Sequence, residues 1–269
     1  MIGLTPPTLP NRPAGYLTRW TTELTDEADF TARVALAKKR FKSRNKKGNK
    51  TFDAVKVALY AMCNETWRCV YCEDNFADEV EHIRPKDIYP EQCFAWTNYV
   101  YACGPCNGPK NNHFAVVDGN GVEHDVTPPR PAPAVRTPPV AGTALLIDPR
   151  VEDPMTLLAL DLGTGGLAPL PGLGALDRRR AEWTRDTLGL NSRRLPRARK
   201  LAIGTFRARL KEYADERDGG ASSATLDVLR TEILGLDHQT VLREMQRQAP
   251  ADPVLQPLFA RLPEVATWW

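Results

Sequence analysis

The 269-residue chain lacks any apolar run of eighteen residues, so its sequence offers no candidate transmembrane helix. Residues 1–12 contain three prolines and no long hydrophobic stretch, and they do not resemble a secretory signal peptide. We therefore expect a cytoplasmic protein without a membrane partner. In that reducing compartment, the six cysteines are better explained as metal ligands or free thiols than as disulfides.

The chain also lacks a large net charge, and the formal value of +3 identifies no partner by itself. Its basic residues are nevertheless clustered in residues 38–50, which include Lys46 and Lys47, and again in residues 178–200. Such clusters attract a nucleic-acid backbone, because binding to phosphates releases counterions. The alternative for each cluster is a solvated helix face or a flexible basic loop.

The distribution of proline suggests a boundary between two parts of the chain. No internal repeat is found in the sequence. Six prolines in residues 126–143 indicate a semi-rigid linker, or a segment draped over the surface. We predict an N-terminal extension with helices in residues 1–66 and a core in residues 67–125. After the linker we predict a mainly helical region in residues 144–269.

Hydrophobic spacing predicts the elements within these parts. Residues 1–15 should be extended, and a helix should follow over residues 26–41. After a basic loop with Gly48, Thr51 should cap a second helix. Beyond the linker, the pattern predicts short strands and then helices: strands at 144–147 and 157–160, a helix at 177–188, a longer helix capped by Asn191 or Ser192, and helices near 226–234 and 241–245.

Four cysteines form two CxxC pairs, Cys69 with Cys72 and Cys103 with Cys106. Each pair can present two thiolates to one ion, and two pairs complete a closed tetrahedral site for structural zinc. The alternative for a single pair is a dithiol redox motif, which the second pair makes a weaker explanation. The other two cysteines, Cys63 and Cys93, fall outside this spacing and are interpreted as core thiols.

Polar residues between and after these pairs follow a recognisable order. Glu81-His82 precedes Asn98, and the second cysteine pair runs directly into Asn107-Gly-Pro-Lys110. This order resembles the HNH nuclease family over about residues 67–114. The resemblance implies an α+β fold: a small ββα-metal unit with structural zinc, flanked by N-terminal helices and a mainly helical C-terminal region.

Phosphodiester hydrolysis needs a nucleophilic water and a cation that stabilises developing negative charge. The resemblance assigns His82 as the general base and Glu81 as a metal ligand. Asn107 supplies an amide oxygen, and such hard donors suit Mg²⁺ or Mn²⁺. By the same resemblance, Asn98 fixes the loop that carries the histidine, and an amide partner would orient its imidazole.

Further side chains near this motif are candidates for contacts with substrate or metal. Lys110 could contact a phosphate, although a solvated lysine is the alternative. His113 could be an extra metal ligand, and Arg84 and Lys86 could touch the substrate backbone.

The leading hypothesis is therefore a metal-dependent HNH endonuclease that cuts DNA. A looser resemblance is to HNH proteins of bacterial anti-phage defence systems such as Septu, in which the nuclease works beside an ATPase partner. One competing hypothesis is a zinc-stabilised nucleic-acid-binding or scaffold protein without catalysis. Another is an effector that cleaves RNA, because the same residues would hydrolyse either nucleic acid.

Overall fold

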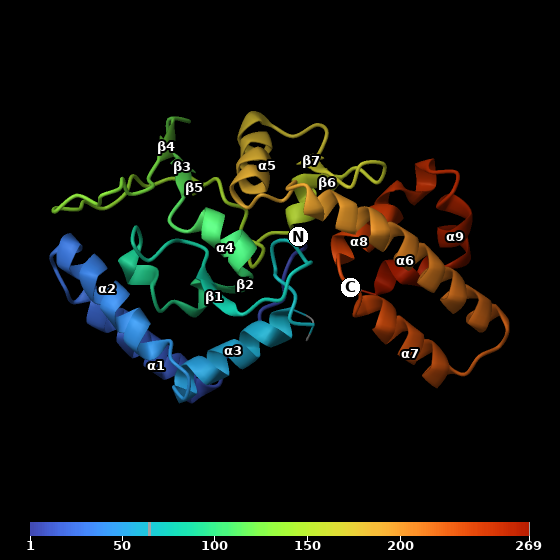
Figure 1. Cartoon of the computed structure of the whole chain (residues 1–269), viewed down its shortest axis with the longest axis horizontal. Helices are drawn as coiled ribbons and strands as arrows, with labels where there is room; N and C mark the ends of the chain where they lie inside the picture. The colour runs from blue at the N-terminus through green and yellow to red at the C-terminus, as the bar shows by residue number, and fades with distance from the viewer. Residues whose placement is uncertain (64–65, 269) are drawn as a thin grey trace.

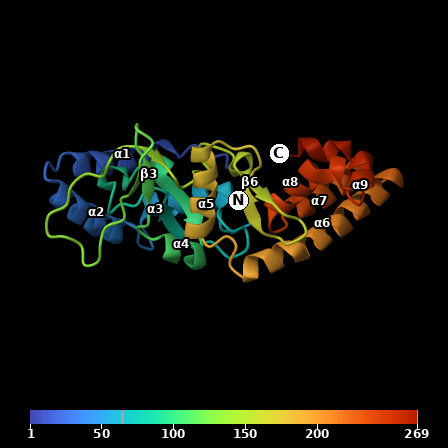
Figure 2. The same cartoon turned by 90° about the horizontal axis from the view of Figure 1, so that it is seen from above.

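The computed structural model describes residues 1–63 and 66–268 and has the α+β fold that the sequence predicts. Helices α1 to α3 lie at one end, α6 to α9 lie at the other, and the small sheets lie between them (Figure 1, Figure 2). The helices are α1 (Asn11–Thr25), α2 (Phe30–Arg44), α3 (Lys50–Met62), α4 (Gly104–Lys110), α5 (Ala175–Thr187), α6 (Arg194–Asp218), α7 (Ser223–Leu234), α8 (Gln239–Gln248) and α9 (Gln256–Arg261). Among the described residues, no helix is long and apolar enough to cross a membrane.

The strands are short and form three separate antiparallel sheets in the described part of the chain. They are β1 (Glu79–His82), β2 (Tyr99–Ala102), β3 (Ala115–Val117), β4 (Glu123–Asp125), β5 (Thr143–Ala144), β6 (Leu158–Leu160) and β7 (Leu167–Pro169). In the first sheet, Glu81 lies opposite Val100 and His82 lies opposite Tyr99. Helix α4 follows β2 directly, so the candidate site is built on a strand–strand–helix unit.

The N-terminal helices differ from the prediction at their starts. Helix α1 begins at Asn11, so the prediction that residues 1–15 are extended is wrong beyond Pro10. A proline in the first helical turn is tolerated, because its missing N–H would have no intrahelical partner there. Helix α3 is capped by Asn49 rather than by Thr51, because the Asn49 side chain accepts hydrogen bonds from the first free backbone N–H groups.

The start of α6 also differs from the prediction. Neither Asn191 nor Ser192 caps the helix; Arg193 is the residue before it and makes no side-chain capping bond. The Asn191 amide instead bonds the backbone N–H and C=O of Leu167, both at 2.8 Å, and so ties the loop to β7. The predicted strand at 157–160 is confirmed as β6, whereas at 144–147 only Ala144 belongs to a strand.

Buried side chains form one continuous hydrophobic core that crosses the predicted domain boundaries. The proline-rich segment 126–143 contacts α2, because the Arg136 backbone N–H donates to Thr31 Oγ1 at 2.9 Å. Helix α8 contacts the cysteine-rich loop, since the Thr240 backbone N–H donates to the buried Glu73 carboxylate at 2.8 Å. The domain boundaries therefore stay a prediction, while the packing joins all parts of the described chain.

One glycine explains how the β6–β7 loop approaches α6. Gly165 has a φ of +76°, and a Cβ there would lie 2.2 Å from the Pro196 carbonyl oxygen. Gly165→Ala should lower the free energy of unfolding by about 2 to 4 kcal/mol, from backbone strain and overpacking together. Gly172 is the matched control: its φ is +85°, but a Cβ meets nothing within 4 Å. Gly172→Ala should therefore lose only about 1 kcal/mol in urea unfolding; equal losses would contradict the packing argument.

Candidate metal centre and catalytic site

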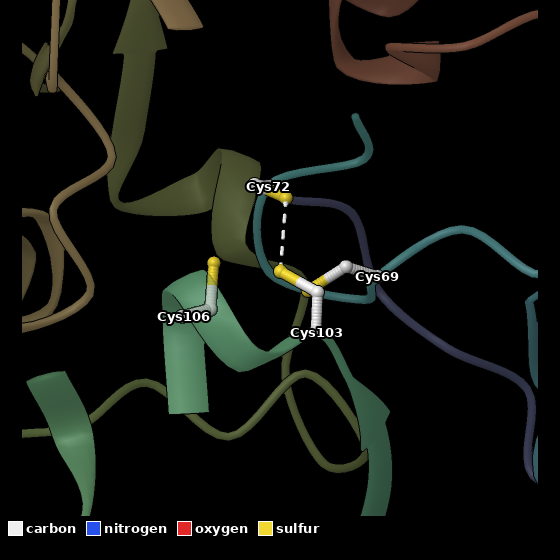
Figure 3. Close-up of side chains that lie close together, drawn as sticks. All are labelled: Cys69, Cys72, Cys103 and Cys106. Carbon is white, nitrogen blue, oxygen red and sulfur yellow. Dashed lines mark hydrogen bonds between the residues drawn. The ribbon is translucent and has the colours of Figure 1, made fainter. Parts of the chain in front are cut away.

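Four cysteine sulfur atoms meet in one buried cluster between the loop after α3 and the start of α4 (Figure 3). The four are Cys69, Cys72, Cys103 and Cys106, their sulfur atoms all lie within 4.8 Å of one another, and none forms a disulfide. The Cys72 and Cys103 sulfur atoms are 3.8 Å apart. A tetrahedral ion with Zn–S bonds of about 2.3 Å requires sulfur–sulfur edges of about 3.8 Å. The cluster is thus arranged to hold a metal ion.

Local backbone hydrogen bonds shape both halves of this cluster. In the first loop, the Glu73 N–H donates to the Cys69 carbonyl at 2.9 Å, and Glu73 adopts a φ of 60°. In the second, the N–H groups of Cys106 and Asn107 donate to the Cys103 carbonyl at 3.1 and 2.9 Å. Each CxxC pair therefore sits on a tight turn that directs both sulfur atoms inward.

The two remaining cysteines lie outside the cluster, in agreement with the sequence interpretation. Burial raises the pKa of the Cys63 thiol to about 12. Burial also raises the pKa of Cys93 to about 12, and its sulfur contacts the Ala37 carbonyl. Both side chains are neutral core thiols at physiological pH.

Strand β1 presents two carboxylates to α4, because residues two apart on a strand share a face. Asn107 Nδ2 donates to Glu79 Oε2 at 2.5 Å on the exposed side of this contact. Lys110, one helical turn further on, forms an ion pair with Glu81 and donates to the His82 carbonyl oxygen at 2.8 Å. Burial raises the pKa of the Glu81 carboxyl, and the Lys110 ammonium opposes that rise. The face between β1 and α4 therefore carries two acids, an amide and a buried cation.

The contacts of this face bear on two expectations from the sequence: the phosphate contact of Lys110, and the metal ligands Glu81 and Asn107. Lys110 is fully buried, so its ammonium contacts Glu81 in place of the expected phosphate. The two expected metal ligands, Glu81 and Asn107, lie at the same strand–helix contact but have different partners: Lys110 bonds Glu81, and Asn107 bonds Glu79. Sequence reasoning missed Glu79, although its position two residues before Glu81 on a predicted strand was the signal that could have found it.

The His82 side chain is directed away from α4 and is buried. Its ring packs edge-on against Phe41 of α2 and Tyr99 of β2, with centroid distances of 4.5 and 5.2 Å. His82 Nε2 lies 2.9 Å from the Cys93 carbonyl oxygen, an interaction that requires Nε2 to carry the proton. Nδ1 is then the acceptor, with no partner within the described ranges. Burial, together with the nearby Lys86 charge, lowers the pKa of His82 to about 3, so the imidazole is neutral at physiological pH.

Asn98 holds the loop that follows the histidine. Its Oδ1 accepts from the Arg84 N–H at 2.8 Å, and its Nδ2 donates to the carbonyls of Arg84 and Gln92 at 2.9 and 3.1 Å. The amide does not bond the imidazole, which the Cys93 carbonyl holds instead. The Asn98 amide therefore joins the two ends of the loop that follows His82, at Arg84 and at Gln92.

The remaining candidates surround this centre. The Arg84 guanidinium lies over the rings of Tyr89 and Phe114, at 5.1 and 5.6 Å, and Lys86 Nζ lies 5.3 Å from the Phe41 ring. His113 is exposed just after the end of α4 and does not belong to the metal-binding cluster of the described residues. Lys46 and Lys47 are exposed in the loop after α2.

Comparison with known proteins gives one local similarity. None of the known family profiles matches this chain. Over 64 residues, the chain is 42% identical to the Septu protein PtuB of Bacillus thuringiensis; the match covers 22% of this chain and 24% of that protein. The chain thus spans about a quarter of the length of the curated relative that it matches.

The cysteine cluster predicts one bound metal ion per chain. Replacing Cys103 and Cys106 with serine should remove that ion and lower the melting temperature, because two of four ligands are lost. Elemental analysis and a thermal scan measure both effects. Cys63→Ala removes a buried cysteine outside the cluster and should keep the metal. A Cys103→Ser/Cys106→Ser protein that retained both metal and stability would show that the cluster is not a metal site.

The buried Glu81–Lys110 pair makes a second prediction. Lys110→Met leaves the Glu81 carboxylate without its cation and should lower the free energy of unfolding by about 3 to 5 kcal/mol. The Glu81→Gln/Lys110→Met protein should lose much less, because no unpaired charge remains buried. Urea unfolding of the two single variants and the double variant measures the coupling. Additive losses would mean that the two side chains do not interact.

The Lys110→Met loss should also depend on pH. Burial raises the folded-state pKa of Glu81 above its ordinary value, and removal of the ammonium raises it further. The folded protein then binds a proton that the unfolded chain releases, so its stability falls as pH rises through this range. The loss relative to wild type should be largest near pH 7 and should shrink in acid.

Proposed function

We propose that this protein is a metal-dependent HNH-type endonuclease that hydrolyses phosphodiester bonds of DNA. The observation that carries the proposal is the grouping of Glu81, His82, Asn98 and Asn107 around one strand–strand–helix unit beside a four-cysteine cluster. A binding module alone requires the cysteines but has no use for this combination of acid, imidazole and amides.

Zinc is the metal that we propose for the cysteines. Four thiolates with tetrahedral spacing suit zinc and leave it no open position, so its role is structural. For catalysis we propose Mg²⁺ or Mn²⁺, held by Glu81 and Asn107. Asn107 donates through Nδ2 to Glu79, so its amide oxygen remains available as a hard donor, and Glu79 adds a carboxylate on the same face. The bound ion would stabilise negative charge that develops on the phosphate.

The protein's own residues supply the proton transfer and its alignment. The Cys93 carbonyl fixes the tautomer of His82 and leaves Nδ1 as the ring nitrogen that would accept a proton from water. Asn98 keeps this loop in place through three backbone hydrogen bonds. Lys110 neutralises Glu81 from the buried side and holds the His82 carbonyl, so it positions both residues without reaching the solvent.

The biological setting that we propose is bacterial anti-phage defence. The local similarity to a protein named Septu protein PtuB supports it. The resemblance to the Septu arrangement further suggests a protein partner such as an ATPase, which would act with the nuclease in the cytoplasm.

Plasmid nicking tests the catalytic proposal. The wild-type protein should nick supercoiled DNA when Mg²⁺ or Mn²⁺ is added, and His82→Ala should reduce the rate by about 100-fold or more, the range expected for loss of a general base. His124→Ala is the matched control, because this histidine pairs with Asp118 in the β3–β4 hairpin and should leave nicking unchanged. Nicking by His82→Ala at the wild-type rate would refute the assignment.

The same assay separates the alternatives. A folded, metal-loaded protein that binds nucleic acid but cleaves neither DNA nor RNA with any divalent ion would be a non-catalytic binding or scaffold protein. Cleavage of RNA alone would identify an RNA-cleaving effector with the same residues.

A further inference from the structure

Helix α6 carries a row of exposed cations along one face. The row consists of Arg193, Arg197, Lys200, Arg207 and Lys211, and we name it the α6 basic row. Successive members are three, four or seven residues apart, so they follow the helical repeat. With a rise of about 1.5 Å per residue, the row is about 27 Å long.

The cations of this row are not neutralised by direct contacts within the described residues. None of its members forms an ion pair or a side-chain hydrogen bond within the part of the chain that the structure describes. Neighbouring arginines behave differently: Arg179 pairs with Glu123 at 2.7 Å, and Arg209 pairs with two glutamates. Within the basic cluster of residues 178–200, three arginines of α5 are paired with acids, and on α6 Arg194 and Arg199 also have partners. The members of the row in this cluster, Arg193, Arg197 and Lys200, form no such pair in the described part of the chain.

Helix stability does not explain the row either. Its cations begin at the N-terminal end of α6, where the helix dipole is positive and where the first turn has no acidic residue. The basic residues of α2 provide the contrast, because Lys42 and Arg44 lie in its last turn, where the dipole favours cations. Arg193 and Arg197, at the N-terminal end of the row, therefore lie where the dipole disfavours cations.

A glycine occupies the gap in the row. Gly204 lies between Lys200 and Arg207 on the same face, and a Cβ there would meet nothing within 4 Å. Glycine in a helix interior lowers stability, and no packing contact requires it here. Beside it, α6 and the α9 segment enclose an open groove of about 460 Å³ that includes Arg207, Lys211 and Leu258. A glycine at this point allows another backbone to approach closely.

We propose that the α6 basic row binds the phosphate backbone of duplex DNA that extends from the catalytic site. This inference rests on the proposed nuclease function. Arg194 pairs with Asp74 at 2.6 Å, which holds the start of α6 against the first cysteine loop. Helix α4 and the first turns of α6 also lie along the same lower edge of the molecule (Figure 2). A row of about 27 Å covers most of one DNA turn of about 34 Å.

The composition of the row favours a nucleic acid over a protein. Protein interfaces are enriched in aromatic side chains and in arginine and depleted in lysine, so the argument here depends on the lysines and on the missing aromatic residues of the row. The row contains no aromatic residue and includes Lys200 and Lys211. Phosphates match several separate cations without an apolar anchor.

Binding of a duplex of about 30 base pairs (about three turns) tests the proposal. The protein carries His82→Ala and no divalent ion is added, so binding is measured without cleavage, over a range of KCl concentrations. Adding Arg207→Gln/Lys211→Gln should weaken binding about tenfold or more at low salt and lower the log–log salt slope by about 2. Arg209→Gln/Arg217→Gln removes two charges that are already paired on the same helix and should change neither.

A second row variant, Gly204→Glu, tests whether weaker DNA binding could result from misfolding. Glutamate is a better helix former than glycine, so the fold should be at least as stable, yet the added negative charge should weaken DNA binding. Unchanged affinity and slope in both row variants would overturn the proposal. Loss of binding in the row variants, together with no nicking by wild type in either Mg²⁺ or Mn²⁺, would support the row and reject the hydrolytic proposal.

Discussion

Four sulfur atoms in one buried cluster are the constraint on which the rest of the site depends. They join the loop after α3 to the junction of β2 and α4, and so fix how α4 lies against β1. That contact places Glu79 and Glu81 opposite Asn107 and Lys110. Four buried thiolates without a cation would repel one another, so an ion held by the cysteines would also stabilise the geometry of the acids and the amide.

The cysteine cluster could be predicted because it depends mainly on local turns. Two CxxC spacings define two tight turns, and little else is needed to expect one ion between them. Local patterns were less informative where two residues compete for one role. Asn49 and Thr51 can both cap a helix, and only the backbone geometry of α3 decides for Asn49. The start of α1 was missed because prolines suggest extended chain, although they also fit a first helical turn.

The partners of the candidate catalytic residues could not be predicted, because they depend on tertiary packing. Strand alternation separates Glu81 from His82, but the rotation of α4 decides that Lys110 meets Glu81. In the same way, the Cys93 carbonyl, eleven residues after His82, reaches the imidazole only because the intervening loop folds back. The sequence motif identifies which chemical groups are present. The protonation and orientation of these groups are set by neighbouring side chains and loops that the motif does not specify.

The contact between Phe41 and His82 has a consequence for how this site can be inherited or transplanted. A residue of α2, from the N-terminal extension, forms one wall of the pocket around the imidazole, and Lys86 covers the same ring. The segment with the HNH-like motif therefore does not contain all the side chains that surround its histidine. Recombination that moved residues 67–125 alone into another protein would leave the histidine solvated, with a different basicity. Such exchanges should succeed only when α2 travels with the motif or the host provides an aromatic ring in its place.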